Sequence, residues 1–350
     1  MPTRSLADDV TARPGANAAT RAAAAVAVLV YLLLAGLLLT AAWLLAIARG
    51  FALINYVLAA ALLGFVWLAR PRLGGLHPDT TTLDRAAAPA LFAVVDAVTE
   101  RLGARRVWRI AISPEYNASY RVVGFRRRVV LTIGYPLWNL LDPAERVALV
   151  AHELAHGVNG DTSRGTLIAP SLNALVEAIH ALRGDLTDDE QGLAAFGATL
   201  GRAVGFVVSL PLLGLLRLQE RLLLSSSRRA EYHADHLAVT VAGAAAVVSL
   251  LHKAHLEDRA LRALRTALVR RDPDPWATAR AWLADLGPIT VPEGDSTDST
   301  HPPTERRIAA VLARSYPAPT FVSTVEEARR ADHEMAPALR DVVSLLREQH

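Results

Sequence analysis

Residues 142–161 read DPAERVALVAHELAHGVNGD and carry the signals of a helix start. Asp142 suits the N-cap, Pro143 suits the first helical position, and Glu145 falls where the acid of a capping box belongs. Apolar residues then recur at every fourth position from 150 to 158, which gives the helix a stripe to bury. The stretch therefore predicts a helix that begins at Pro143 and packs one side into a core.

Two histidines lie four residues apart on this helix and therefore share one face. His152 and His156 can offer ring nitrogens to a single metal ion, and Glu153 is close enough to act on a water bound there. This HExxH pattern indicates a zinc site, and the alternative is a helix whose histidines fill a core or a surface. The chain has no cysteine, so disulfides are excluded and zinc must be held by His, Asp or Glu.

A catalytic zinc usually takes three protein ligands and keeps a fourth position for water. A metzincin-type site would place a histidine ten residues after the first one, but that position is Thr162. A glutamate from a later helix is the other common solution, and Glu231 supplies one. Asp235 lies one turn further on the same helix face, where it could orient a ligating histidine. His233 and His236 flank Glu231 and could compete with it as the third ligand, but their spacing points them to other sides of that helix, which favours Glu231.

Two uncharged runs lie near the N-terminus: 22–48 is well beyond the roughly 20 residues that a bilayer needs, and 51–69 is also long enough. A signal peptide is rejected, because the first run is too long and the second follows at once. Arginines flank the pair on its outer sides, with one in the turn. The pattern predicts a disordered tail at 1–21, a transmembrane hairpin at 22–70, and a domain at 84–350 that faces the cytoplasm.

The rest of the chain predicts a mostly helical α+β domain. Three strand-like runs, at 107–112, 116–123 and 129–133, are expected to form a small antiparallel sheet before the metal helix, with Arg126, Arg127 and Arg128 in a solvated turn. Helices are expected at 84–102, 166–182, 225–270, 303–314 and 325–347, and a loop at 272–300. The run 193–216 either crosses the membrane or packs as a helical hairpin on the domain.

The formal net charge is +3. No basic stripe with interleaved aromatic residues appears in the sequence, so a nucleic-acid partner is not expected.

Several ordered motifs resemble the integral-membrane zinc metalloproteases that include HtpX and the type 1 CAAX prenyl proteases. The resemblance covers roughly residues 85–310 and the general character of the N-terminal hairpin. It rests on the HExxH helix closed by Asn159-Gly160-Asp161, on Ser227-Arg228 followed by Glu231 and Ala234-Asp235, on Thr300-His301-Pro302-Pro303 leading to Arg307, and on Asn117-Ala118. The family has Asn-Ala-Phe-Ala at this last motif, whereas here Asn117-Ala118 is followed by Ser119-Tyr120.

The resemblance implies a zincin-like domain that holds one Zn²⁺ per chain. His152, His156 and Glu231 would be its ligands, Glu153 the general base, and Asp235 the partner that orients a ligand.

Three further residues match family positions, two of them near the bound peptide and one that braces the site. Asn117 and His301 would hold the peptide backbone or the developing oxyanion, and Arg307 would brace the site through a carboxylate. Each also has a simpler interpretation: Asn117 as the end of a strand, His301 as a loop residue, and Arg307 as a surface arginine.

The resemblance implies a membrane-anchored endopeptidase that cuts unfolded or membrane proteins at or near the bilayer. Two alternatives stay open: a processing protease for one precursor or prenylated tail, and a non-proteolytic scaffold with a structural zinc. Physiological substrate and oligomeric state are not predicted.

Overall fold

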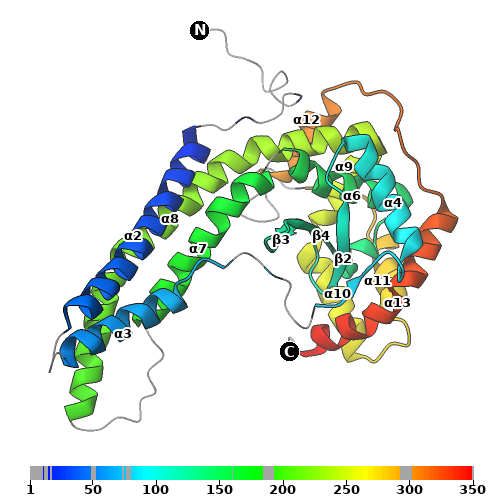
Figure 1. Cartoon of the computed structure of the whole chain (residues 1–350). Coiled ribbons are helices and arrows are strands. Elements are labelled where there is room, and N and C mark those ends of the chain that lie inside the picture. Colours follow the sequence, from blue (N-terminus) through cyan, green and yellow to red (C-terminus); the bar gives the residue numbers. More distant parts are fainter. Residues whose placement is uncertain are drawn as a thin grey trace. The chain divides into compact units, whose positions relative to one another are not determined.

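The computed structural model describes residues 11, 15, 18–48, 53–72, 75, 80–159, 161–183, 193–291 and 302–348. Its helices outnumber its strands by far, and one small mixed sheet is present (Figure 1). The chain divides into two compact units. The first, the site unit, contains residues 1–15, 75–162 and 227–350, and the second, the helical unit, contains 16–74 and 163–226.

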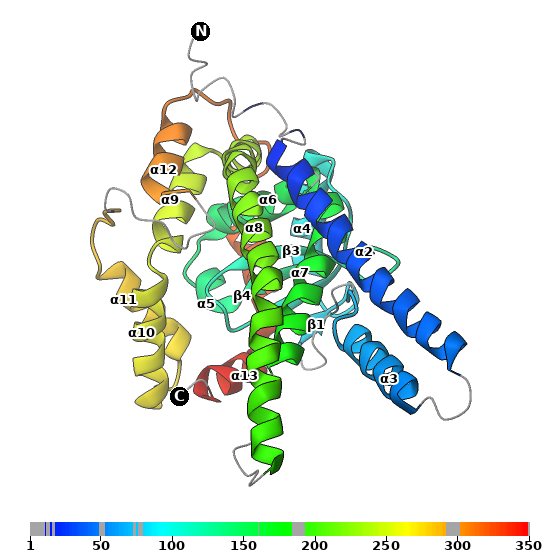
Figure 2. The same cartoon turned by 90° about the vertical axis from the view of Figure 1, so that its left-hand side faces the viewer.

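The helical unit is built from α2 (Ala18–Ile47), α3 (Leu53–Leu68), α7 (Asp161–Arg183) and the part of α8 (Leu193–Ala242) that precedes residue 227. Helix α2 lies beside α3 (Figures 1 and 2). Two small clusters of apolar side chains join α2, α7 and α8. A buried hydrogen bond of 2.7 Å from Gln219 Nε2 to Ser171 Oγ links α8 to α7. The expected helix at 166–182 is confirmed within α7.

Among the described residues, α2 and the part of α8 from Ala203 to Ala242 are long and apolar enough to cross a membrane. Helix α3 has 16 residues, fewer than the roughly 20 that a bilayer usually requires. The run 193–216 belongs to α8, one helix of 50 residues that continues through Pro211. Whether it crosses a bilayer stays a prediction.

The site unit surrounds one continuous hydrophobic core. Its elements are β1 (Thr82–Leu83), α4 (Pro89–Leu102), β2 (Val107–Ser113), β3 (Ala118–Val123), β4 (Arg128–Gly134), α5 (Tyr135–Trp138), α6 (Pro143–Val158), the end of α8, α9 (Ala244–Ala254), α10 (Glu257–Val269), α11 (Pro275–Ala284), α12 (Thr304–Leu312) and α13 (Val325–Glu348). Helix α6 packs against α4, α9 and β3, and α13 packs against α4 and β2.

The sheet has the order β1-β2-β4-β3. The expected antiparallel arrangement is wrong for the central pair, because β2 and β4 run parallel, whereas β1–β2 and β3–β4 are antiparallel. Strand β4 is buried from Val129 onward and takes the centre, while the partly exposed β3 lies at the edge. The more apolar strand gains more by being covered on both faces, which is why it separates two strands that are consecutive in sequence.

The loop expected at 272–300 is wrong in its first half, where α11 lies. Asp274 caps this helix by accepting a hydrogen bond of 2.9 Å from the backbone N of Ala277, and Pro275 follows at its first position. Trp276 is buried with its ring edge on Tyr135, at a centroid distance of 4.8 Å. Burial of this aromatic ring stabilises a short helix whose neighbourhood is otherwise rich in loop residues.

Helix α13 is tied to the start of α4 and to α6 by carboxylates. Arg146 on α6 donates 2.9 Å hydrogen bonds to both carboxylate oxygens of Asp332, which also accepts from Trp138 Nε1 at 3.1 Å. Glu334 accepts from the backbone N–H groups of Ala90 and Leu91, at 2.8 and 2.9 Å. These bonds satisfy free donors at the first turn of α4 and hold the C-terminal helix against the element that carries the histidines.

Candidate active site

The helix that carries both histidines begins as predicted. Glu145 N donates to Asp142 Oδ1 at 3.1 Å, and Asp142 N donates to Glu145 Oε2 at 2.7 Å, so the capping box is complete. Glu145 is buried, and its carboxylate also accepts from Lys253 Nζ at 2.6 Å and from the Ser249 hydroxyl on α9. The N-terminal end of α6 is thereby fixed to a second helix.

The other end of α6 lies against the edge strand. A Cβ atom added at Gly157 would come 2.6 Å from Cζ of Tyr120, so a larger residue at this position would force the Tyr120 ring to shift. Tyr120 is buried at the contact. The strand edge is therefore held next to the helical turn that carries His156.

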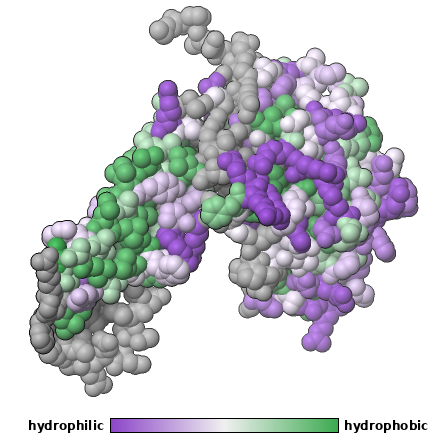
Figure 3. Space-filling view, viewed as in Figure 1, coloured by the Kyte–Doolittle hydropathy of each residue, from purple (hydrophilic) through white to green (hydrophobic). Residues whose placement is uncertain are grey.

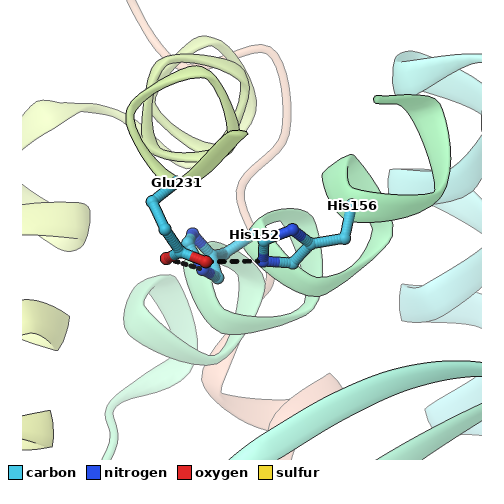
Figure 4. Close-up of side chains that lie close together, drawn as sticks. All are labelled: His152, His156 and Glu231. Carbon is cyan, nitrogen blue, oxygen red and sulfur yellow. Dashed lines mark ion pairs between the residues drawn. The ribbon is translucent and has the colours of Figure 1, made fainter. Parts of the chain in front are cut away.

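The two histidines and Glu231 meet although 75 residues separate His156 from Glu231 in the sequence. Nε2 of His152 lies 3.6 Å from one carboxylate oxygen of Glu231, and Nε2 of His156 lies 3.5 Å from the other (Figure 4). One possible ligand atom from each residue lies within 4.8 Å of the others. The His156 side chain is 21% exposed, against 9% for His152, so the cluster opens toward solvent on the side of His156.

A second carboxylate orients the first histidine. Nδ1 of His152 lies 3.1 Å from Oδ1 of Asp235, so its Nε2 is left facing Glu231. Arg307 donates from Nε and Nη2 to the two oxygens of Asp235, at 2.8 and 2.6 Å, and its Nη1 lies 3.6 Å from Glu231. All three groups are buried. The surface-arginine alternative for Arg307 is therefore wrong, because the guanidinium is needed to neutralise two buried carboxylates.

The charge balance of this buried set favours a cation between the ligand atoms. Burial alone lowers the pKa of His152, but its hydrogen bonds to Asp235 and Glu231 outweigh this effect and raise the pKa to about 10. Burial also lowers the pKa of Arg307, and the charge of Asp235 reverses this and raises it above its ordinary value. A proton on His152 thus supplies the positive charge beside the two carboxylates that a bound metal ion can supply instead.

Two residues outside the expected set connect the helices that carry these side chains. Asn159, at the C-cap of α6, donates from Nδ2 to the carbonyl oxygen of Ala230 at 3.1 Å, and its Oδ1 lies 2.5 Å from Nδ1 of His233. Both side chains are buried. His236 instead lies near Tyr316, with Nδ1 3.4 Å from the hydroxyl. Both neighbouring histidines therefore make contacts away from the ligand cluster, as their helical spacing from Glu231 predicts.

We call the contacts of Asn159 with Ala230 and His233 the Asn159 clamp, and the sequence contained only an indirect signal for it. Asn159 stands directly after the metal helix, where a C-cap residue is expected, but the partner of its amide comes from a helix 71 residues away.

The remaining predicted residues are less tightly connected to the cluster. Asn117 is exposed directly before β3, and its carbonyl oxygen accepts a 2.7 Å hydrogen bond from Gly134 N. Its role toward a substrate stays a prediction. His301 lies outside the described residues. Glu153, which follows His152 in the sequence, is partly buried, and its role as a base also stays a prediction.

The sequence profile of peptidase family M48 matches residues 95–315, which is more than half of the chain and includes every predicted site residue. The chain belongs to peptidase family M48. Helix α13 lies beyond the matched residues, although its Asp332 binds Arg146 of the metal helix.

Curated relatives of this M48 chain are proteases named HtpX. One from Pseudomonas putida is 28% identical over 42% of this chain and 50% of its own length. Another from Acinetobacter baylyi is 26% identical over 55% of this chain and 64% of its own length. A third, from Hahella chejuensis, is 26% identical over 58% of this chain and 65% of its own length. The chain thus spans about half to two thirds of the length of these relatives. No solved structure matches it.

The family implies a metal, and the donor set of this M48 chain fits one. Bonds of about 2.0–2.1 Å to a tetrahedral zinc ion place its ligand atoms about 3.3–3.4 Å apart. The two separations between Nε2 atoms and carboxylate oxygens, 3.6 and 3.5 Å, are close to that value. The partner of His152 Nδ1 is a carboxylate, which is the usual outer partner of a zinc-bound histidine. The two distances involve different oxygens of Glu231, and one ligand atom from each of the three residues lies within 4.8 Å of the others. His152, His156 and Glu231 could therefore bind one ion once these atoms move closer together.

Proposed function

We propose that this protein is a zinc-dependent endopeptidase, with one Zn²⁺ held by His152, His156 and Glu231. The observation that carries the proposal is the convergence of these three side chains around one point, with Asp235 bound to the far nitrogen of His152. Three ligands leave a fourth position for water, whereas structural zinc sites usually fill all four. The greater exposure of His156 supports an open position on its side.

The protein side chains then have distinct tasks. A bound zinc ion would polarise the scissile carbonyl and make an attacking water more acidic. Glu153 accepts the proton of that water and passes it to the leaving amine. Asp235 and Arg307 keep His152 in the tautomer whose Nε2 faces the ion. His301 is proposed to stabilise charge on the carbonyl oxygen.

The edge strand supports an extended peptide as the substrate. Within the part of the chain that the structure describes, strand β3 pairs with β4 on one side only, and it packs on α6 through Tyr120 and Gly157. A peptide that adds to this edge would be held by backbone hydrogen bonds, with Asn117 at the start of the strand. Because such bonds are independent of side-chain identity, we infer unfolded polypeptides and membrane proteins as substrates, as in protein quality control.

The proposed location is the cell membrane, with several spans and the site unit in the cytoplasm. Two helices with the length and hydropathy of spans support it, and so do the arginines that flank the N-terminal pair. The chain lacks cysteine, so a single Val269→Cys substitution on the exposed end of α10 provides a topology probe. A membrane-impermeant maleimide should label it only after cells are opened, and labelling of intact cells would contradict this orientation.

The activity is tested with the full chain in neutral detergent, by measuring zinc content and cleavage of casein together. We expect about one zinc per chain and cleavage in the wild type. Glu153→Gln should keep zinc but lose cleavage, and Glu231→Ala should lose both. Glu220→Ala removes an exposed carboxylate from the same helix and should change neither. Zinc retained by Glu231→Ala would show that this residue is not a ligand.

The outcome of this experiment also separates the alternative functions. A wild type that binds zinc and cuts a defined precursor peptide, but not casein, would favour a processing protease. A wild type that binds zinc and cuts neither would favour a structural zinc in a scaffold.

A further inference from the structure

Arginine is concentrated in the segment from Arg101 to Leu141. This segment contains eight arginines and a single acidic residue, Glu115, although the whole chain has a formal charge of only +3. The fold gathers several of them around the β3–β4 hairpin. Arg105, before β2, donates from Nη2 to the carbonyl oxygen of Arg127 at 2.8 Å. Two turns that are 22 residues apart thus form one basic surface.

The tip of the hairpin combines this charge with an exposed aromatic ring. Gly124 and Arg127 both have left-handed backbones, with φ of 64° and 49°, and Arg127 N donates to Gly124 O at 3.0 Å. The ring between them, Phe125, is 93% exposed, more than any other large apolar side chain in the described part of the chain. Arg126 beside it is also exposed. A phenylalanine so fully in water contributes nothing to the core of this unit.

The outer face of the sheet continues the basic surface. Trp108 packs on a small apolar cluster and stacks against the guanidinium groups of Arg109 and Arg128, at 4.9 and 4.4 Å from the ring centroid. Arg121 on β3 is exposed, and Arg106 lies 3.7 Å from Asp96, which already binds Arg85. Figure 3 shows strongly hydrophilic side chains gathered over this part of the site unit.

An exposed aromatic ring among arginines matches the boundary of an anionic bilayer. The ring can enter the region between headgroups and acyl chains, while arginines nearby bind phosphate and carboxylate groups. Mutual repulsion among the arginines is relieved by such a surface. We propose that the β3–β4 hairpin, with Arg105 and Arg106, docks on the anionic headgroups of a lipid bilayer. Nucleic acid is the rival ligand. Bilayer docking is favoured because Trp108 is partly buried and stacked by two guanidinium groups, which leaves Phe125 as the exposed ring, and because the chain also carries helices apolar enough to cross a bilayer.

Docking is tested by fluorescence of the full chain reconstituted into vesicles. Because the chain has no cysteine, Phe125→Cys creates a single site for an environment-sensitive aromatic probe. Its emission should shift to the blue and be quenched by spin-labelled lipid in vesicles of phosphatidylcholine with phosphatidylserine. Both effects should be much smaller in phosphatidylcholine alone. Val269→Cys is the matched control, because Val269 is 75% exposed and also precedes two arginines. Its probe should respond to neither lipid.

Charge variants identify the groups responsible. Arg121→Gln with Arg126→Gln should weaken docking on phosphatidylserine by about 25-fold, because each arginine near the surface is worth about fivefold in affinity. Arg270→Gln with Arg347→Gln removes two exposed arginines elsewhere and should leave the response intact.

The proposal is overturned if the probe at position 125 responds equally to both lipids or stays accessible to aqueous iodide in both. It is also overturned if the two hairpin arginines instead control binding of a labelled oligonucleotide and the lipid response is absent. These measurements do not involve cleavage, so their outcome is independent of the assigned zinc chemistry.

Discussion

Nδ1 of His152 lies 3.1 Å from Oδ1 of Asp235, while Nε2 of the same ring faces Glu231. Asp235 is itself held by two hydrogen bonds from Arg307. A histidine oriented in this way is prepared to bind a cation before the cation arrives, because its tautomer and ring plane are already set.

Asp235→Asn should weaken zinc binding by about 10- to 100-fold, because the amide cannot support the charge on His152 and Arg307 loses its partner. The measurement is competition for zinc with a chelating dye. Glu220→Ala provides the control for a lost carboxylate on the same helix. Unchanged affinity in Asp235→Asn would contradict the orienting role.

Zinc affinity should rise with pH. In the metal-free protein the pKa of His152 is raised to about 10, so the proton on this ring stabilises the fold fully below about pH 6.5 and less as the pH approaches 10. Zinc must displace that proton, so affinity should increase about tenfold per pH unit from about 6.5 to about 9. Titration at several pH values measures the slope. Asp235→Asn should flatten the dependence of zinc affinity on pH above neutral pH. A zinc affinity that does not change with pH in the wild type would contradict displacement of the His152 proton.

Asn159→Ala should loosen the two ligand-bearing helices. The buried amide binds Ala230 O and His233, so its removal leaves two polar groups without this partner and should cost about 2–4 kcal/mol of unfolding free energy. Zinc affinity should fall together with stability, because Glu231 follows Ala230 directly. Chemical denaturation with and without zinc measures both effects. Asn173→Ala, at an exposed position on α7, is the control for loss of an asparagine amide.

Lys253→Met should destabilise the site unit by about 3 kcal/mol, because it leaves the buried carboxylate of Glu145 without its cation. Lys253→Met combined with Glu145→Gln should recover much of the loss, since the charge is then gone as well. Thermal unfolding of both variants shows whether the loss of stability comes from the unpaired charge of Glu145 or from lost packing of Lys253. Equal destabilisation in the double variant would mean that the contact acts through packing rather than charge.

Local patterns in the sequence determined the metal helix in detail. The capping box, the proline at the first position and the spacing of His152 and His156 depend on residues within one or two turns of each other, and the structure contains that helix from Pro143 to Val158. The helices expected near 303–314 and 325–347 are also confirmed, as α12 and α13. Such features follow from backbone periodicity and capping, which act over short distances along the chain.

Contacts between distant segments were decided only by the tertiary structure. The parallel pairing of β2 with β4, the burial of Arg307 on Asp235 and the clamp from Asn159 to Ala230 join residues that no local pattern connects. The gathering of Arg105 with Arg127 at the hairpin is of the same kind. Such pairs form because closing the chain buries apolar surface and forces the polar groups left inside to find partners. Their identity therefore depends on the packing of the whole unit.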